Sequence, residues 1–136
     1  MSHQRTLERP VRCEGIGLHT GEKVSMTLYP APATRGVVFR RTDLPAAPTI
    51  EARPENVVDT QNATTIAKGG VSVKTIEHLM SAFAGLGVDN VQVDLFGPEI
   101  PILDGSAAPF VDLIRSAGLR RQFAPKTFLK VRQPIA

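Results

Sequence analysis

Apolar and polar residues alternate along several short stretches of the chain, which is the period of a β-strand with one buried face. The clearest example is 24–29, where Val, Met and Leu alternate with Ser, Thr and Tyr, followed by 91–95. Shorter or looser stretches predict further strands over 6–18, 37–41, 49–52, 64–67, 71–73 and 127–131. Turn residues separate the predicted strands in the first half of the chain, so the pattern predicts a mainly antiparallel sheet.

The stretch 74–90 has instead the period of an amphipathic helix. Its apolar residues fall on one side: Ile76, Leu79, Met80, Phe83 and Leu86. Thr75 is a good N-cap, and Gly85 or Gly87 can close the C-terminal end. The opposite side carries residues with little bulk or charge: Glu77, His78, Ser81 and Gly85. Because a solvated helix face usually carries several charges, we expect another body to cover this one.

A second helix is predicted after its N-cap Ser106, and Gly118 is its stop signal. Its apolar stripe consists of Phe110, Val111, Leu113 and Ile114. Two helices packed on one mainly antiparallel sheet make a two-layer α+β sandwich, and we assign this first domain to residues 1–120. Residues 119–125 are predicted to be a linker. We assign 121–136 to linker and the first strand of an absent second domain; alternatively, that strand joins the first domain's sheet.

Composition narrows the classes of function. A chain of 136 residues with 42% apolar and 21% charged residues is typical of one folded globular domain. The net charge of +3 favours anionic ligands, but Lys and Arg form no run of five, so we expect no nucleic-acid partner. The single cysteine, Cys13, excludes an intrachain disulfide. No window is apolar over the length of a transmembrane segment, and we expect a cytoplasmic protein.

Glu77 and His78 are the first candidates for chemistry. The positive end of the helix dipole favours a neutral imidazole, which binds metals, and an anionic carboxylate beside it. The pair could therefore supply one zinc ligand and one general base that takes a proton from a zinc-bound water. The alternative is a solvated or packed pair with no chemical role, which is the more common fate of a Glu-His dipeptide.

Other candidates do not complete a metal centre. Catalytic zinc takes three protein ligands, yet Ala82 stands one turn after His78, so the His-Glu-x-x-His arrangement is absent. His19 lies in a glycine-rich turn, where it either lines a cleft or bonds nearby backbone. Asp104 is suited to capping the turn before the second helix, and a role in a site is the alternative. The glycines of 15–21 match neither a P-loop nor a dinucleotide fingerprint.

Five motifs together resemble the N-terminal half of the UDP-3-O-acyl-N-acetylglucosamine deacetylase family. They are GIGLHTG at 15–21, RRTD at 40–43, TIEHL at 75–79, AGLGVDN at 84–90 and EIPILDGSAAPF at 99–110. They follow the family's order and spacing over nearly the whole chain. The resemblance implies a cytoplasmic zinc-dependent amidase of lipid A biosynthesis, built from two similar α+β domains whose helices enclose the active site.

The resemblance also implies residue roles. His78 corresponds to a zinc ligand, and Glu77 to the base that deprotonates the water attacking the acetamide of UDP-3-O-acyl-N-acetylglucosamine. His19 and Asp104 correspond to positions near the active site. A loop that borders the substrate in the family corresponds here to Thr60, Gln61, Asn62 and Ala63, whose polar composition departs from the family pattern.

The larger departure is length. The family's other zinc ligands lie in a His-Lys-x-x-x-Asp segment of the second domain, which this chain lacks. We therefore expect an incomplete Zn²⁺ site and no activity from the chain alone. The absent domain is expected to pack on the helix face of Glu77, Ser81 and Gly85. The chain is then either a fragment or a shortened relative, and the alternative function is a non-catalytic interaction or regulatory domain.

Overall fold

The computed structural model describes residues 2–126. Within this range the strands are β1 (His3–Leu7), β2 (Val11–Ile16), β3 (Lys23–Pro30), β4 (Val37–Arg41), β5 (Thr49–Glu51), β6 (Val57–Asp59), β7 (Thr65–Lys68), β8 (Val71–Lys74), β9 (Val91–Phe96) and β10 (Leu119–Pro125). The helices are α1 (Glu77–Leu86) and α2 (Ala108–Ala117), and a 3₁₀ turn covers Pro54–Asn56. None of these helices is long and apolar enough to cross a membrane.

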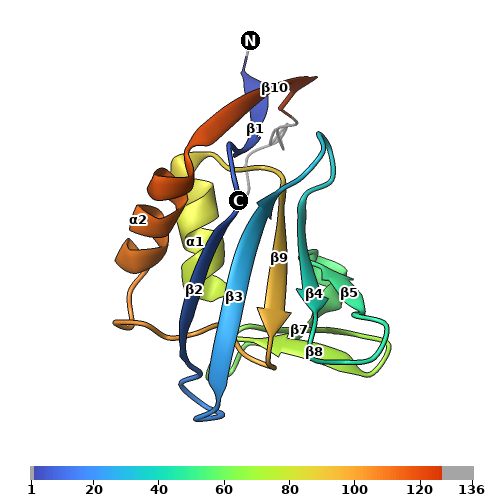
Figure 1. Cartoon of the computed structure of the whole chain (residues 1–136). Helices are drawn as coiled ribbons and strands as arrows, with labels where there is room; N and C mark the ends of the chain where they lie inside the picture. Colours follow the sequence, from blue (N-terminus) through green and yellow to red (C-terminus); the bar gives the residue numbers. More distant parts are fainter. Residues whose placement is uncertain (1, 127–136) are drawn as a thin grey trace, which may run out of the picture.

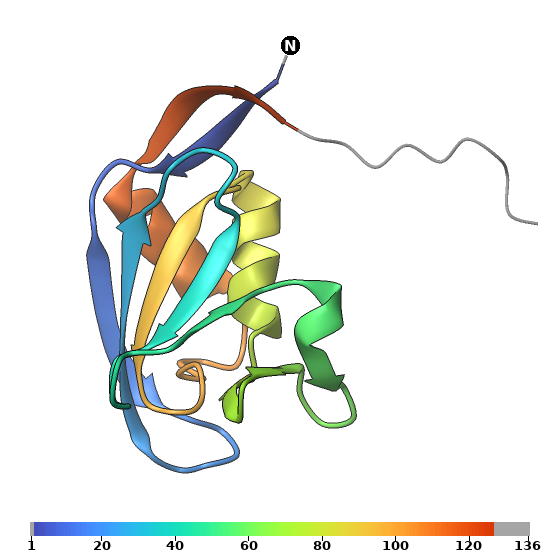
Figure 2. The same ribbon diagram turned by 90° about the vertical axis from the view of Figure 1, so that its right-hand side faces the viewer.

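Five strands form the main sheet in the order β2-β3-β9-β4-β5, and only the β4–β9 pair is parallel. Both helices lie against one face of this sheet (Figures 1 and 2). The predicted two-layer α+β fold is thus confirmed. Two smaller sheets accompany it: β1 pairs with β10, and β6-β7-β8 form a three-stranded sheet beside the start of α1.

The core forms where the helices meet the main sheet. On β3 and β9 every second residue is buried, as the alternation predicts: Val24, Met26, Leu28, Val91, Val93 and Leu95. The helices contribute Leu79 and Phe83 from α1 and Phe110 and Ile114 from α2. Each such side chain contributes roughly 1.5–3 kcal/mol relative to an exposed position. This packing fixes the orientation of α1, and with it the direction of the opposite helix face.

The stretch 6–18, predicted as one strand, is two strands in different sheets. β1 ends at Leu7 and β2 begins at Val11. Pro10 lies in the break, and it has no backbone N–H with which to continue a ladder. The chain turns there from the small β1–β10 sheet into the edge of the main sheet.

The linker predicted over 119–125 is also wrong, because this segment is β10 and runs antiparallel to β1, with Leu119 opposite Leu7. Its polar side chains hold it in place. Gln122 donates to the Ala31 carbonyl at 2.9 Å and accepts from the buried Asn90 amide at 2.8 Å. The strand predicted over 127–131 lies outside the described residues.

The predicted N-caps need correction as well. α1 begins at Glu77, and Thr75 does not cap it: its hydroxyl donates to the Glu99 carboxylate, at 2.6 Å, and its φ is +63°. The helix closes at Gly87, in the left-handed conformation that favours glycine. Ala107, not Ser106, occupies the N-cap position of α2. The Ser106 hydroxyl oxygen nevertheless accepts a hydrogen bond from the Ala108 N–H at 3.3 Å.

Candidate active site

The first turn of α1 places Glu77 and His78 side by side, both half-buried. The carboxylate of Glu77 accepts long hydrogen bonds from the Thr64 N–H, 3.3 Å to Oε1 and 3.4 Å to Oε2. The Thr64 carbonyl in turn accepts from the N–H groups of Thr75, at 2.9 Å, and Ile76, at 3.3 Å. The segment before β7 therefore holds both the backbone at the start of α1 and the first acidic side chain of the helix.

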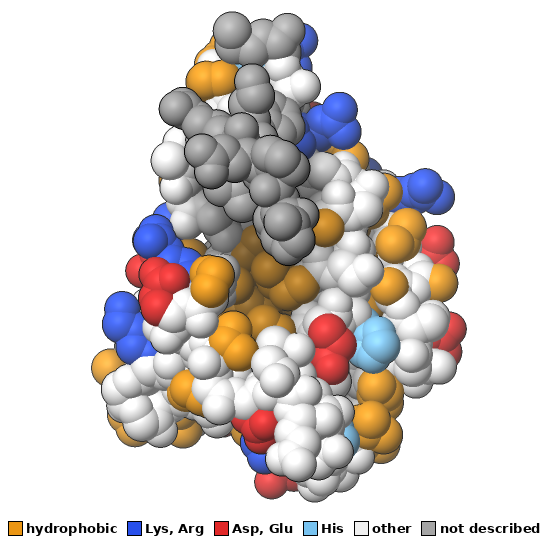
Figure 3. Space-filling model, turned by 180° about the vertical axis from the view of Figure 1, so that it is seen from behind, with side chains coloured by type: hydrophobic (Ala, Val, Ile, Leu, Met, Phe, Trp, Pro, Cys, Tyr) orange, Lys and Arg blue, Asp and Glu red, His pale blue; other side chains and the backbone are white. Residues whose placement is uncertain are grey.

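The helix face that continues from Glu77 is exposed at Ser81, Ala84 and Gly85. No other element of residues 2–126 buries it. Figure 3, which views the molecule from behind, shows an apolar hollow on this side with acidic and histidine side chains beside it. Residues 2–126 thus leave this helix face uncovered, and its covering by another body stays a prediction.

Sequence reasoning missed Glu99, which is 0% exposed. Its carboxylate accepts from the backbone N–H of Thr20 at 2.9 Å, from the N–H of His19 at 3.1 and 3.2 Å, and from the Thr75 hydroxyl at 2.6 Å. Within the described residues no Lys or Arg forms an ion pair with it. A lone acidic residue inside the mostly apolar run 98–103 is the sequence signal that indicates such a buried carboxylate.

The environment of Glu99 favours its charged form. Burial acts to raise the pKa of this carboxyl group, but hydrogen bonds from Thr75, Thr20 and His19 outweigh it and leave the pKa below its ordinary value. Gly17 permits the close approach, because a Cβ there would overlap the Glu99 carboxylate and the Thr20 hydroxyl. The glycine-rich turn thus packs directly against the buried Glu99 carboxylate.

His19 lines a cleft of about 220 Å³ together with Asn62 and Ala63, so three of the predicted cleft residues converge. Asp59, Thr65 and Lys74 complete its walls. The other two predicted loop residues, Thr60 and Gln61, face a separate hollow of about 550 Å³ shared with Val57, Val58 and Asp59. The predicted substrate loop is therefore divided between two neighbouring depressions, and Asp59 belongs to both.

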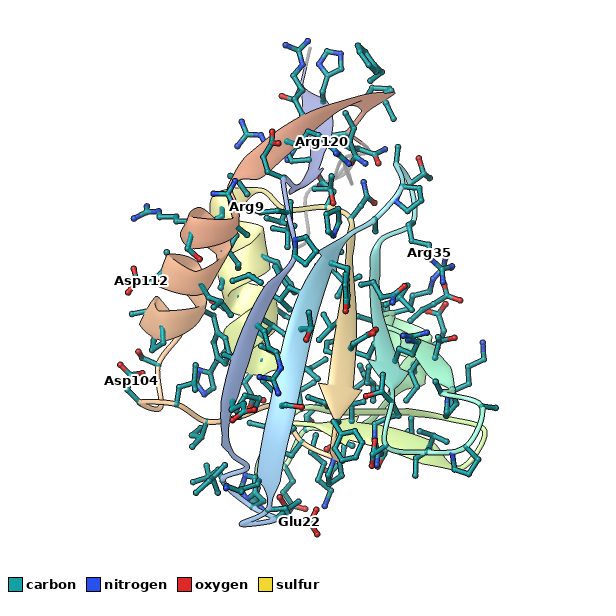
Figure 4. The ribbon with its side chains drawn as sticks, in the orientation of Figure 1. Arg9, Glu22, Arg35, Asp104, Asp112 and Arg120 are labelled. Carbon is teal, nitrogen blue, oxygen red and sulfur yellow. The ribbon has the colours of Figure 1, made fainter. Side chains whose placement is uncertain are left out.

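Asp104 is exposed in the turn that leads into α2, where Figure 4 labels it. Its Oδ1 accepts from the Ser106 N–H at 2.9 Å and from the Ser106 hydroxyl at 2.7 Å. These hydrogen bonds hold the pKa of Asp104 below its ordinary value, and the charge of His78 adds to the effect. Asp104 therefore has the turn-capping contacts that the sequence suggested, and it lies within electrostatic range of His78.

The described residues do not complete a zinc site. No group of three or more His, Cys, Asp or Glu side chains within 2–126 is arranged to hold a metal ion. His78 is the one predicted ligand, whereas catalytic zinc takes three ligands from the protein. A metal centre at this position needs donors from outside the described part of the chain.

The chain is similar in sequence to a family of known proteins over nearly its whole length. The family model described as "LpxC: UDP-3-O-acyl N-acetylglycosamine deacetylase" matches residues 4–136. The chain is 56% identical over 135 residues to the UDP-3-O-acyl-N-acetylglucosamine deacetylase of Methylococcus capsulatus, covering 99% of this chain and 44% of that protein. It is 54% identical to the protein of the same name from Teredinibacter turnerae, covering 99% of the chain and 45% of the relative.

These matches extend over nearly the whole chain, so this α+β domain is of a class found in proteins named as deacetylases. The chain belongs to the LpxC family. It spans rather less than half the length of the curated relatives that it matches.

Proposed function

We propose that the chain takes part in zinc-dependent hydrolysis of the acetamide of UDP-3-O-acyl-N-acetylglucosamine, as one of two parts that form the active site. One observation carries the proposal: Glu77 and His78 adjoin each other at the start of α1, on a face that residues 2–126 leave uncovered. The names of the relatives supply the substrate and the reaction type.

We assign Glu77 the role of general base for the water that attacks the acetamide carbonyl. Glu77 is half-buried, and within residues 2–126 its carboxylate receives only the long hydrogen bonds from Thr64, so it retains the capacity to accept a proton. His78 is assigned as one Zn²⁺ ligand. The remaining ligands are assigned to a second domain that packs on the face of Glu77, Ser81 and Gly85.

We assign substrate contacts to the two depressions beside this helix. His19, Asn62 and Ala63 line the smaller one, and Thr60 and Gln61 line the larger. Asp104 acts here through its charge near His78 and through the turn that it caps.

The test joins this chain to the C-terminal portion of the Methylococcus capsulatus relative and measures release of acetate from the substrate. Glu77→Gln is expected to lower kcat by about 10²- to 10⁴-fold, the usual contribution of a general base. Asp112→Asn, on the exposed side of α2 (Figure 4), is the matched control and leaves kcat unchanged. Full activity of the Glu77→Gln protein would overturn the assignment.

The 136-residue chain provides a second arm. It is expected to bind zinc weakly and to release little or no acetate, because it lacks two ligands. Stoichiometric, tightly held zinc with turnover from this chain alone would contradict the proposal of a two-part site.

The small residues of the uncovered face also suit the alternative of a non-catalytic interaction domain. That function predicts that Glu77→Ala and His78→Ala preserve the biological role. Bulky substitutions at Ser81 or Gly85 would then abolish it. The deacetylase proposal predicts that Glu77→Ala and His78→Ala are themselves inactivating, so the two functions are separable.

A further inference from the structure

Glu99 is a buried carboxylate that the proposed reaction does not use. An unpaired buried charge is costly unless hydrogen bonds satisfy it, and here three donors from two distant segments do so. His19 and Thr20 supply two backbone N–H groups from the turn between β2 and β3. Thr75 supplies a hydroxyl from the residues before α1. One side chain thus joins the two segments that carry His19 and the Glu77–His78 pair.

The backbone at Thr75 shows that this junction is specific. Its φ of +63° lies in the left-handed region, where a β-branched residue is an outlier that costs about 1–3 kcal/mol. The hydroxyl of Thr75 reaches Glu99 from this conformation, and its N–H reaches the Thr64 carbonyl. Only Ile76 separates Thr75 from Glu77, whose carboxylate accepts a hydrogen bond from the Thr64 N–H. A shift at Thr75 is therefore transmitted to the start of α1.

The opposite side of the junction is equally close-fitting. Gly17 lies against the Glu99 carboxylate with no room for a Cβ. The segment that carries Glu99 is itself tied to Lys74, because the Lys74 N–H donates to the Pro98 carbonyl and the Ile100 N–H donates to the Lys74 carbonyl. Glu99 consequently cannot move toward one segment without disturbing the other.

We infer that Glu99 is a positioning residue for the proposed deacetylation, one that holds the His19 turn and the first turn of α1 in a single arrangement. This inference rests on the proposed function. It assigns to Glu99 no contact with substrate: the effect of the carboxylate passes through the backbone of His19 and through Thr75. Misplacement of reacting groups by about 1 Å can lower a rate by about 10²-fold, so a group that sets this spacing affects catalysis strongly.

The first experiment uses the 136-residue chain and amide hydrogen exchange, which requires neither zinc nor activity. Glu99→Gln keeps the size of the side chain but removes its charge and one acceptor oxygen. Protection of the His19 and Thr20 amides is expected to fall at least about tenfold. Thr6→Val is the matched control, because it removes a buried hydroxyl that donates to the Asn90 carbonyl at 2.6 Å. Thr6 is in β1, at the opposite end of the molecule from the turn between β2 and β3 (Figure 1).

The second experiment measures kcat and KM in the extended protein described above. Glu99→Gln and Gly17→Ala are both expected to lower kcat, by about 10²-fold at most, with a smaller change in KM. Thr6→Val is expected to leave both parameters within a few-fold of the unsubstituted protein. Gly17→Ala displaces the turn while the carboxylate remains, so it tests position separately from charge.

The outcomes separate the inference from the function on which it rests. Unchanged protection of His19 and Thr20 in Glu99→Gln, or a kcat no lower than that of Thr6→Val, would overturn the positioning inference while deacetylation stands. An unsubstituted extended protein without deacetylase activity would instead overturn the proposed function. Loss of protection together with a selective loss of kcat supports both.

Discussion

Arg41 of β4 donates a hydrogen bond from Nη1 to the backbone carbonyl of Ser72 in β8, at 2.8 Å. The same guanidinium binds both carboxylate oxygens of Asp43, at 2.9 and 2.7 Å. The nearly buried Arg41 side chain thus connects the β6-β7-β8 sheet to the main sheet. Because β8 leads directly into α1, this contact also helps to determine where the helix begins.

We expect Arg41→Met to lower the free energy of unfolding by about 3 kcal/mol, since it leaves the Asp43 carboxylate and the Ser72 carbonyl without their donor. Arg40→Met is the control. Arg40 pairs with Asp94 in a similar two-bond arrangement, but its side chain is 41% exposed, so the loss is expected to be about 1 kcal/mol or less. Urea unfolding measures both, and equal losses would contradict this account.

The low pKa of Glu99 makes stability depend on pH. A depressed carboxyl pKa contributes stability above the ordinary pKa of Glu, about 4.3, and this contribution is lost as the pH falls through the folded-state value. The free energy of unfolding of the unsubstituted chain is therefore expected to fall below about pH 4 more steeply than that of Glu99→Gln. Urea titrations between neutral and acidic pH test this, and parallel curves would show that Glu99 does not contribute.

The buried side-chain amide of Asn90 helps to attach β10 to the rest of the domain. Asn90 donates to Gln4 at 2.9 Å and to Gln122 at 2.8 Å, and it accepts from the Gly36 N–H at 2.8 Å. Asn90→Asp replaces the donor by an acceptor that faces two amide oxygens, so we expect a loss of about 3 kcal/mol at neutral pH. Asn90→Ala, which removes the group without adding charge, should lose less. Thermal unfolding can rank the two, and the opposite order would refute this prediction.

Gly85 in α1 and Gly87, the C-cap residue that follows the helix, are expected to respond in opposite directions to substitution by Ala. Gly85 is helical, and a Cβ there meets no atom of the described residues within 4 Å, so Gly85→Ala should stabilise the 136-residue chain by roughly 0.5 kcal/mol. Gly87 has a φ of +69°, and Gly87→Ala should destabilise it by about 1 kcal/mol. Chemical denaturation measures both. Destabilisation by Gly85→Ala would mean that the face is already covered in this chain.

The sequence predicted well those elements whose pattern is local. The alternation on β3 and β9 and the apolar stripe on α1 identified the core, because burial selects for the same period that the backbone imposes. Glu77 and His78 lie in the first turn of α1 as predicted, although the N-cap is Ile76 and not Thr75, and their roles stay predictions. His19, Asn62 and Ala63 line one cleft, and their contacts with substrate stay predictions.

The errors arose where partners are distant in sequence. Thr75 has the chemistry of an N-cap, but its hydroxyl donates instead to Glu99, 24 residues away. The segment 119–125 is polar enough for a linker, yet Gln122 completes a buried network with Asn90, 32 residues away. Hydrogen-bonding groups accept either a local or a distant partner, and sequence pattern alone does not distinguish between them.

The pairing of β1 with β10 bears on the order of events during synthesis. The Gln4 side chain bonds the Pro125 carbonyl across a sequence separation of 121 residues, and the Lys126 N–H donates to the Ser2 carbonyl at 3.0 Å. β1 must therefore wait for its partner strand until almost all of residues 2–126 have emerged from the ribosome. Such long-range pairing slows folding, and until it forms β1 presents an open strand edge to other chains. Nascent chains stalled before residue 119 should thus engage chaperones more than those stalled well beyond residue 126.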